Sequence, residues 1–160
     1  MILTEEQKKN IKTMCVVTYA NDLKERQKKG QFFTPPELII KMIEKFDDLD
    51  RDFIDPCGGN GNLLVGLIAV GVSPESIYFN ELDENEYKTG VKRLTELGVP
   101  EDHCTNFDAL SDEFEEYYKN ASMSVIINPP YLRNTHLKIL KKMIDIFIKE
   151  ENKNEENKKV

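Results

Sequence analysis

The sequence is poor in the residues that build disulfide frameworks and zinc sites. It has three cysteines in 160 residues, far apart at positions 15, 57 and 104, and only two histidines. No two cysteines have the CxxC spacing of a metal or redox motif, and the histidines are isolated from each other. We therefore expect reduced thiols, no disulfide framework and no bound metal.

Long apolar runs are also absent. No segment approaches the roughly 18 to 20 consecutive apolar residues that cross a bilayer. The N-terminal sequence MILTEEQKKN becomes polar after three residues, which is not the pattern of a secretory signal. The length suits one domain with a core of its own. We expect a cytoplasmic protein that does not contact a membrane.

The net charge of -7 is unevenly distributed along the chain. Residues 1–31 hold seven Lys and Arg against four Asp and Glu, and residues 133–160 hold eight against five, so the negative excess lies in the middle. An acidic centre does not attract a polyanion. A nucleic-acid partner would have to contact the basic ends or another subunit.

The apolar pattern predicts an α/β fold. A helix is expected over residues 5–26 after a capping box at Thr4 and Gln7, and a second one after FFTPP, with Thr34 as its N-cap. Four short apolar strands then alternate with amphipathic helices, which predicts parallel pairing in a doubly wound sheet. We expect a helical segment at 1–30, a cofactor-binding domain at 31–149 and a polar, disordered tail at 150–160.

Unusual residues stand where the first three strands end, and ligands of such sheets bind beyond the carboxyl ends of the strands. The first strand runs into the glycine-rich turn 55–61, DPCGGNG, whose glycines permit positive φ and a close approach to a ligand. Glu81 ends the second strand and could accept both hydroxyls of a ribose. Asp83, just beyond it, is more typical of a solvated charge. Asp108 follows the third strand and could accept an exocyclic amine.

The fourth strand ends in Asn128-Pro129-Pro130-Tyr131. Two prolines remove two backbone donors and fix two φ angles, so the chain must leave the sheet there. The strand therefore presents an amide and an aromatic ring at the same edge as the glycine turn.

This order of elements resembles the S-adenosylmethionine-dependent DNA adenine-N6 methyltransferases, most closely the type I modification subunits of restriction-modification systems. The residues that carry the resemblance are Phe33-Thr34-Pro35, Asp55-Pro56, Gly59, Gly61, Glu81, Asp108 and Asn128 to Tyr131. It covers residues 28–140 and implies a Rossmann-like methyltransferase fold with strand order 3-2-1-4.

The resemblance also implies a role for each matching residue. Phe33, Thr34 and Pro35 would meet the methionine carboxylate of S-adenosyl-L-methionine, and Asp55, Pro56, Gly59 and Gly61 would form the loop against which this cofactor lies. Glu81 would take the ribose hydroxyls and Asp108 the adenine amine of the cofactor. Asn128 and the carbonyl of Pro129 would accept the hydrogens of a target adenine amine flipped from DNA, Pro130 would fix the geometry, and Tyr131 would stack on the base.

The chain has four strands where the family's catalytic domain has seven, so we expect a truncated domain whose open sheet edge is covered by a second copy or a heterologous subunit.

Two alternatives to DNA adenine methylation stay open. A non-catalytic module that binds S-adenosylmethionine or modulates restriction would also fit. A protein glutamine methyltransferase shares the Asn-Pro-Pro-Tyr motif but lacks the upstream Phe-Thr-Pro element.

Overall fold

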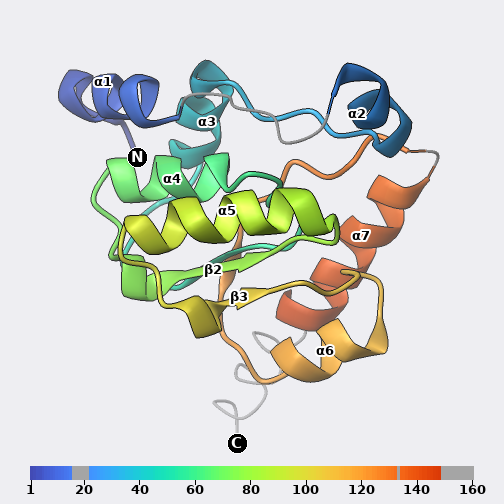
Figure 1. Ribbon diagram of the computed structural model, residues 1–160. Coiled ribbons are helices and arrows are strands. Elements are labelled where there is room, and N and C mark those ends of the chain that lie inside the picture. The colour runs from blue at the N-terminus through green and yellow to red at the C-terminus, as the bar shows by residue number, and fades with distance from the viewer. Residues whose placement is uncertain (16–21, 133, 149–160) are drawn as a thin grey trace, which may run out of the picture.

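Four parallel strands form the centre of the computed structural model, which describes residues 1–15, 22–132 and 134–148 (Figure 1). The strands are β1 (Phe53–Asp55), β2 (Ile77–Asn80), β3 (Cys104–Thr105) and β4 (Ser124–Val125). They lie in the order β3-β2-β1-β4, and every pair is parallel. The predicted doubly wound α/β sheet and its strand order are confirmed.

Seven α-helices surround the sheet within the described part of the chain. Their bounds are α1 (Glu5–Met14), α2 (Leu23–Lys29), α3 (Pro36–Ile43), α4 (Asn62–Ala69), α5 (Glu84–Glu96), α6 (Asp112–Tyr118) and α7 (Thr135–Met143). A π-helical segment, Ile144–Ile148, continues α7. Among these described helices none has the length and apolar character that a membrane span requires.

Helices cover both faces of the sheet because successive strand residues point to opposite sides. Phe53 and Phe79 pack with α1, α3 and α4 in one apolar cluster, whereas Ile54 packs with α6 and α7 in a second. Both phenylalanines are fully buried, and each such side chain contributes roughly 1.5 to 3 kcal/mol to folding. Figure 1 shows α4 and α5 over one side of the sheet and α6 on the other.

The predicted single helix over residues 5–26 is wrong. The chain leaves the helical conformation at Cys15, with φ -86° and ψ 53°, and a new helix begins after Asp22, whose carboxylate accepts the N–H of Glu25. Residues 16–21 and the predicted tail at 150–160 lie outside the described residues. The capping box at Thr4 is confirmed, and Gly30 ends α2 with a φ of 66°.

The predicted N-cap role of Thr34 is also wrong. The helix α3 begins at Pro36, with Pro35 at the N-cap position and no side-chain cap. The hydroxyl of Thr34 is instead a partner of Asn128, 94 residues further along the chain. A competing long-range hydrogen bond has therefore replaced the local one that the sequence indicates.

Two glycines bring α5 close to the first strand end. A Cβ added at Gly58 or at Gly90 would lie 2.4 Å from the ring of Phe79, which sits between them. A side chain at either position would force the loop and the helix apart. These glycines therefore hold the loop after β1 against α5 and fix the floor of the site.

Candidate functional site

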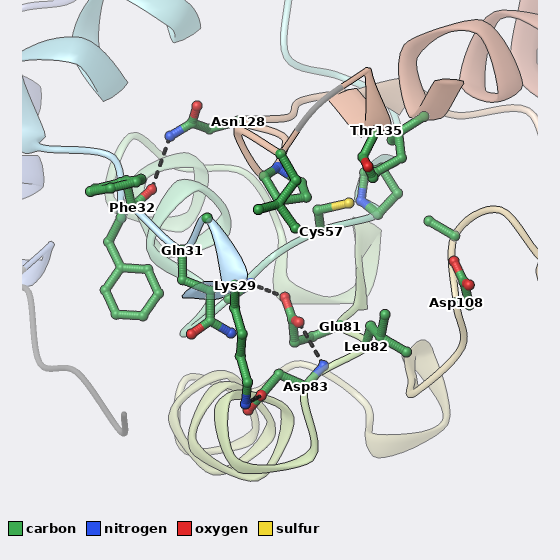
Figure 2. Close-up of a pocket in the computed structure, with 18 of the residues that line it drawn as sticks. Lys29, Gln31, Phe32, Cys57, Glu81, Leu82, Asp83, Asp108, Asn128 and Thr135 are labelled. Carbon is green, nitrogen blue, oxygen red and sulfur yellow. Dashed lines mark hydrogen bonds and ion pairs between the residues drawn. The ribbon is translucent and has the colours of Figure 1, made fainter. Parts of the chain in front are cut away.

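A cavity of about 640 Å³ lies beyond the carboxyl ends of the strands. That volume is within the range of about 300 to 1,000 Å³ that small-molecule sites occupy. Its walls come from the loops after all four strands and from the end of α2 with the segment that follows. Figure 2 shows Asn128 and Glu81 on opposite sides of Cys57.

Gly59 forms the part of the glycine turn that faces this cavity. Its φ is 54°, and an added Cβ would lie 2.8 Å from the ring of Phe33. Glycine takes this conformation without strain, and its lack of a side chain leaves room for the ring of Phe33 to pack against the turn. The turn and the ring of Phe33 together form one wall of the cavity.

Glu81 places a carboxylate at the floor of the cavity (Figure 2). Its Oε2 accepts the N–H of Gly59 at 2.7 Å and its Oε1 accepts the N–H of Asp83 at 2.8 Å. Burial raises the pKa of Glu81, against the effect of these backbone donors. A carboxylate offers about four acceptor positions, so Glu81 keeps acceptor capacity for a ligand beside its backbone partners.

Asp83 is not the solvated charge that the sequence suggests, because only 10% of its side chain is exposed. One oxygen accepts the N–H groups of Asn85 and Glu86 at the start of α5, and the other pairs with Lys29 at 2.5 Å. The hydrogen bond to Asp83 raises the pKa of Lys29. This ion pair fastens the end of α2 over the cavity beside Glu81.

Asn80 is a residue of the site that sequence reasoning missed. It is fully buried, and its amide nitrogen donates to the carbonyls of Pro56 and Phe107 at 2.9 and 3.0 Å. Its oxygen accepts from Thr105 and from the N–H of Phe107. One side chain thus ties together the loops after β1, β2 and β3. The sequence signal for this role is an asparagine at the end of an otherwise apolar strand.

Asn128 stands at the opposite side of the cavity, with every polar atom of its side chain engaged. Its Nδ2 donates to the carbonyl of Phe32 and to the hydroxyl of Thr34, both at 3.1 Å. Its Oδ1 accepts the hydroxyl of Tyr131 at 2.8 Å. Tyr131 is 61% exposed, so the amide oxygen is turned toward the outside of the molecule.

Asp55 lies beneath the glycine turn, only 1% exposed. Its carboxylate accepts the N–H of Cys57 at 3.1 Å, and burial raises its pKa well above the usual range. It borders a small recess of about 20 Å³, which Thr34, Gly59 and Asn128 also line. The recess lies next to the main cavity, since both share Gly59 and Asn128.

The structure brings together most of the residues predicted for the site. Those that line the cavity or the recess are Phe33, Thr34, Asp55, Pro56, Gly59, Glu81, Asp108, Asn128 and Pro130. Pro35, Gly61, Pro129 and Tyr131 line neither. Gly61 has a φ of 80° at the start of α4, which gives it a role in the turn itself. In the described part of the chain, no group of three His, Cys, Asp or Glu could hold a metal ion.

Comparison with known proteins identifies relatives for this arrangement. A family model described as N-6 DNA Methylase matches residues 14–159. The type II methyltransferase M.VspI of Vibrio sp. (strain 343) is 34% identical over 112 residues, which is 66% of this chain and 26% of that protein. The structure of the type IIG restriction endonuclease BpuSI matches with a TM-score of 0.46 and 19% identity, covering 90% of this chain and 15% of that one. The chain thus spans about a quarter of the length of its curated relative.

Proposed function

The chain belongs to the N-6 DNA methylase family, and from this premise we propose that it carries the catalytic site of a DNA adenine-N6 methyltransferase. It would transfer a methyl group from S-adenosyl-L-methionine to the exocyclic amine of adenine, acting with a second copy or a partner subunit. The observation that carries the proposal is the position of Asn128. Its amide oxygen is turned outward at one wall of a cavity whose floor holds the carboxylate of Glu81.

The residues around the cavity fit S-adenosylmethionine. The glycine turn at Gly59 would lie against the cofactor, the acceptor oxygens of Glu81 would take its ribose hydroxyls, and the carboxylate of Asp108 would take its adenine amine. When bound, the cofactor supplies an activated methyl group, so the task left to the protein is positioning.

Asn128 and the carbonyl of Pro129 would act on the target amine. An exocyclic amine conjugated to an adenine ring is a poor nucleophile, and two acceptors in its hydrogen positions shift the nitrogen toward sp³ geometry. The prolines hold these acceptors without any titratable base. Because the hydroxyl of Tyr131 occupies Oδ1 of Asn128 in this structure, the amine would replace it there, leaving the tyrosine ring to stack on the base. Such stacking contributes roughly 1 to 3 kcal/mol per base.

The target adenine would be taken out of the duplex before it reaches this site. Both α2 and α7 contribute residues to the cavity lining, and these helices carry the exposed lysines Lys24, Lys28, Lys138 and Lys141. We place the phosphate contacts there, since the middle of the chain is acidic. The family match supports DNA as the substrate over a protein glutamine.

Binding of S-adenosylmethionine is the first expected result. Calorimetry on the purified chain should give a one-site isotherm, and the melting temperature should rise with ligand concentration because the ligand binds only the folded state. S-adenosylhomocysteine, which lacks the transferable methyl group, is the ligand for comparison in both measurements. The absence of both heat and thermal shift at millimolar ligand would contradict the methyltransferase proposal and the binding-module alternative together.

The edge of the sheet is where we propose that a second copy or a partner subunit binds. β4 pairs with β1 and is an outer strand of the four-stranded sheet. Such an edge presents unpaired backbone groups to another chain. Sedimentation at micromolar concentration is expected to show a species larger than a monomer. A clean monomer would rule out self-association and leave the heterologous subunit.

A further inference from the structure

The orientation of the Asn128 amide needs a cause, because the terminal torsion of an asparagine side chain is broad and roughly two-fold. In one orientation the oxygen would face the target amine and could accept its hydrogens. In the other the NH₂ group would face it, donor against donor, and no acceptor would remain. The transfer proposed above therefore depends on what holds the NH₂ end of Asn128.

Two acceptors on the segment after α2 hold that end. The carbonyl of Phe32 and the hydroxyl of Thr34 each lie 3.1 Å from Nδ2 of Asn128. If the amide turned over, Oδ1 would face the carbonyl oxygen of Phe32, which cannot donate. The Phe32 carbonyl therefore selects one orientation, in which Oδ1 points toward the hydroxyl of Tyr131, and the Thr34 hydroxyl adds the second hydrogen bond that holds the amide in it.

Thr34 is itself held in place by Asn62 at the start of α4. It is 3% exposed, and its carbonyl accepts Nδ2 of Asn62 at 2.8 Å. Asn62 is also buried, and its Oδ1 accepts from Arg93 of α5 at 3.0 Å. Arg93 in turn donates to the carbonyls of Met14 and Asn60. A continuous chain of hydrogen bonds thus runs from α5 through the start of α4 to Thr34 and Asn128.

We propose that Thr34 is a positioning residue, which holds the Asn128 amide in the orientation that the Phe32 carbonyl selects, with its oxygen toward the target amine, and is held in turn by Asn62. The inference rests on the proposed function, since it assigns Asn128 as the acceptor of the amine. It differs from the role that the family resemblance implies for Thr34, a contact with the methionine carboxylate. The two roles make opposite predictions for cofactor affinity.

The test replaces Thr34 with valine, which keeps the shape and removes the hydroxyl, and with serine, which keeps the hydroxyl. Loss of one hydrogen bond in the transition state is expected to lower the kcat of Thr34→Val about tenfold. The dissociation constant for S-adenosylmethionine should change less than about twofold, well below the change of about tenfold that loss of one hydrogen bond to the cofactor would cause. Thr34→Ser should restore kcat. Thr13→Val, at an exposed position on α1, is the matched control and should behave like the parent protein.

A second readout does not depend on catalysis. In ¹⁵N-labelled protein, the side-chain NH₂ resonances of Asn128, identified by their loss in Asn128→Ala, should shift and exchange faster with solvent in Thr34→Val and return in Thr34→Ser. Unchanged resonances would overturn the proposal, and so would a dissociation constant weakened tenfold or more with kcat unchanged. If the parent protein transfers no methyl group at all, the proposed function fails, while the resonances still decide whether Thr34 orients Asn128.

Discussion

Replacing Asn128 with alanine is expected to lower methyl transfer to adenine by roughly 10² to 10³-fold, the effect of removing one positioned polar group that acts on the reacting centre. The variant loses the amide oxygen that accepts from Tyr131 in this structure and would accept the target amine. Binding of S-adenosylmethionine should stay within a few-fold of the parent value, because Glu81 and the glycine turn remain. Transfer is measured with labelled cofactor and affinity by calorimetry.

Asn120→Ala is the matched control for this experiment. Asn120 is exposed and precedes β4, whereas Asn128 follows the same strand, so both variants remove one asparagine near one strand. Asn120→Ala should leave transfer and affinity unchanged. An equal loss of transfer and of cofactor affinity in Asn128→Ala would mean that Asn128 holds the fold and does not act on the amine.

Replacing Glu81 with glutamine is expected to weaken S-adenosylmethionine binding about a hundredfold, the sum of two charge-assisted hydrogen bonds at roughly 1.5 kcal/mol each. The amide also loses one of the two backbone N–H groups, of Gly59 and Asp83, that the carboxylate accepts. Glu75→Gln is the control, since Glu75 is exposed just before the same strand, β2. Unchanged affinity in Glu81→Gln would contradict the ribose contact.

The same carboxylate predicts a pH dependence. Burial raises the pKa of Glu81 in the folded protein. The group therefore takes up a proton at a higher pH than an ordinary glutamate, whose pKa is about 4.3. Cofactor affinity should fall as the pH drops through this raised pKa. The stability of the unliganded protein should change in the opposite direction. Between the pKa of Glu81 in the unfolded chain and its raised pKa in the folded protein, the native state binds more protons, so the free energy of unfolding declines as the pH rises. Both trends should be smaller in Glu81→Gln.

The sheet could be predicted because its signals are local. Short apolar runs such as IYF at 77–79 indicate strands, and glycines that can take positive φ follow α4 and α5 at Gly71 and Gly98. The turn residues after each strand are brought together by topology alone, since parallel strands share one carboxyl edge. Most of the site residues that line the cavity therefore follow from strand order and position.

Long-range polar contacts could not be predicted in this way. Thr34 has the local signature of an N-cap, yet its hydroxyl is a partner of Asn128. From the sequence, Lys29 belongs to the basic end of a helix and Asp83 is a solvated charge. In the fold these two residues, 54 positions apart, form an ion pair. Asn62 and Asn80 have no motif of their own. Each depends on which backbone groups the completed fold leaves without partners.

The break between α1 and α2 shows a further limit. The pattern from Glu5 to Arg26 has helical spacing, but Asp22 offers a strong N-cap near the end of this range, and the structure uses it. A cap inside an apparent helix was a visible signal of a second start. The consequence for the site is direct, because a separate α2 can end at Lys29 and lie beside the cavity.

The most direct measurement of the central claim is methyl transfer from labelled S-adenosylmethionine to unmethylated DNA, followed by digestion to nucleosides, with a glutamine-containing release-factor peptide as the competing substrate. The protein is assayed alone and with the subunit that covers its sheet edge, once that subunit is identified. The proposed function predicts label in N6-methyladenine, and Asn128→Ala should remove it. Tight cofactor binding with label in the peptide, or in neither substrate, would contradict it.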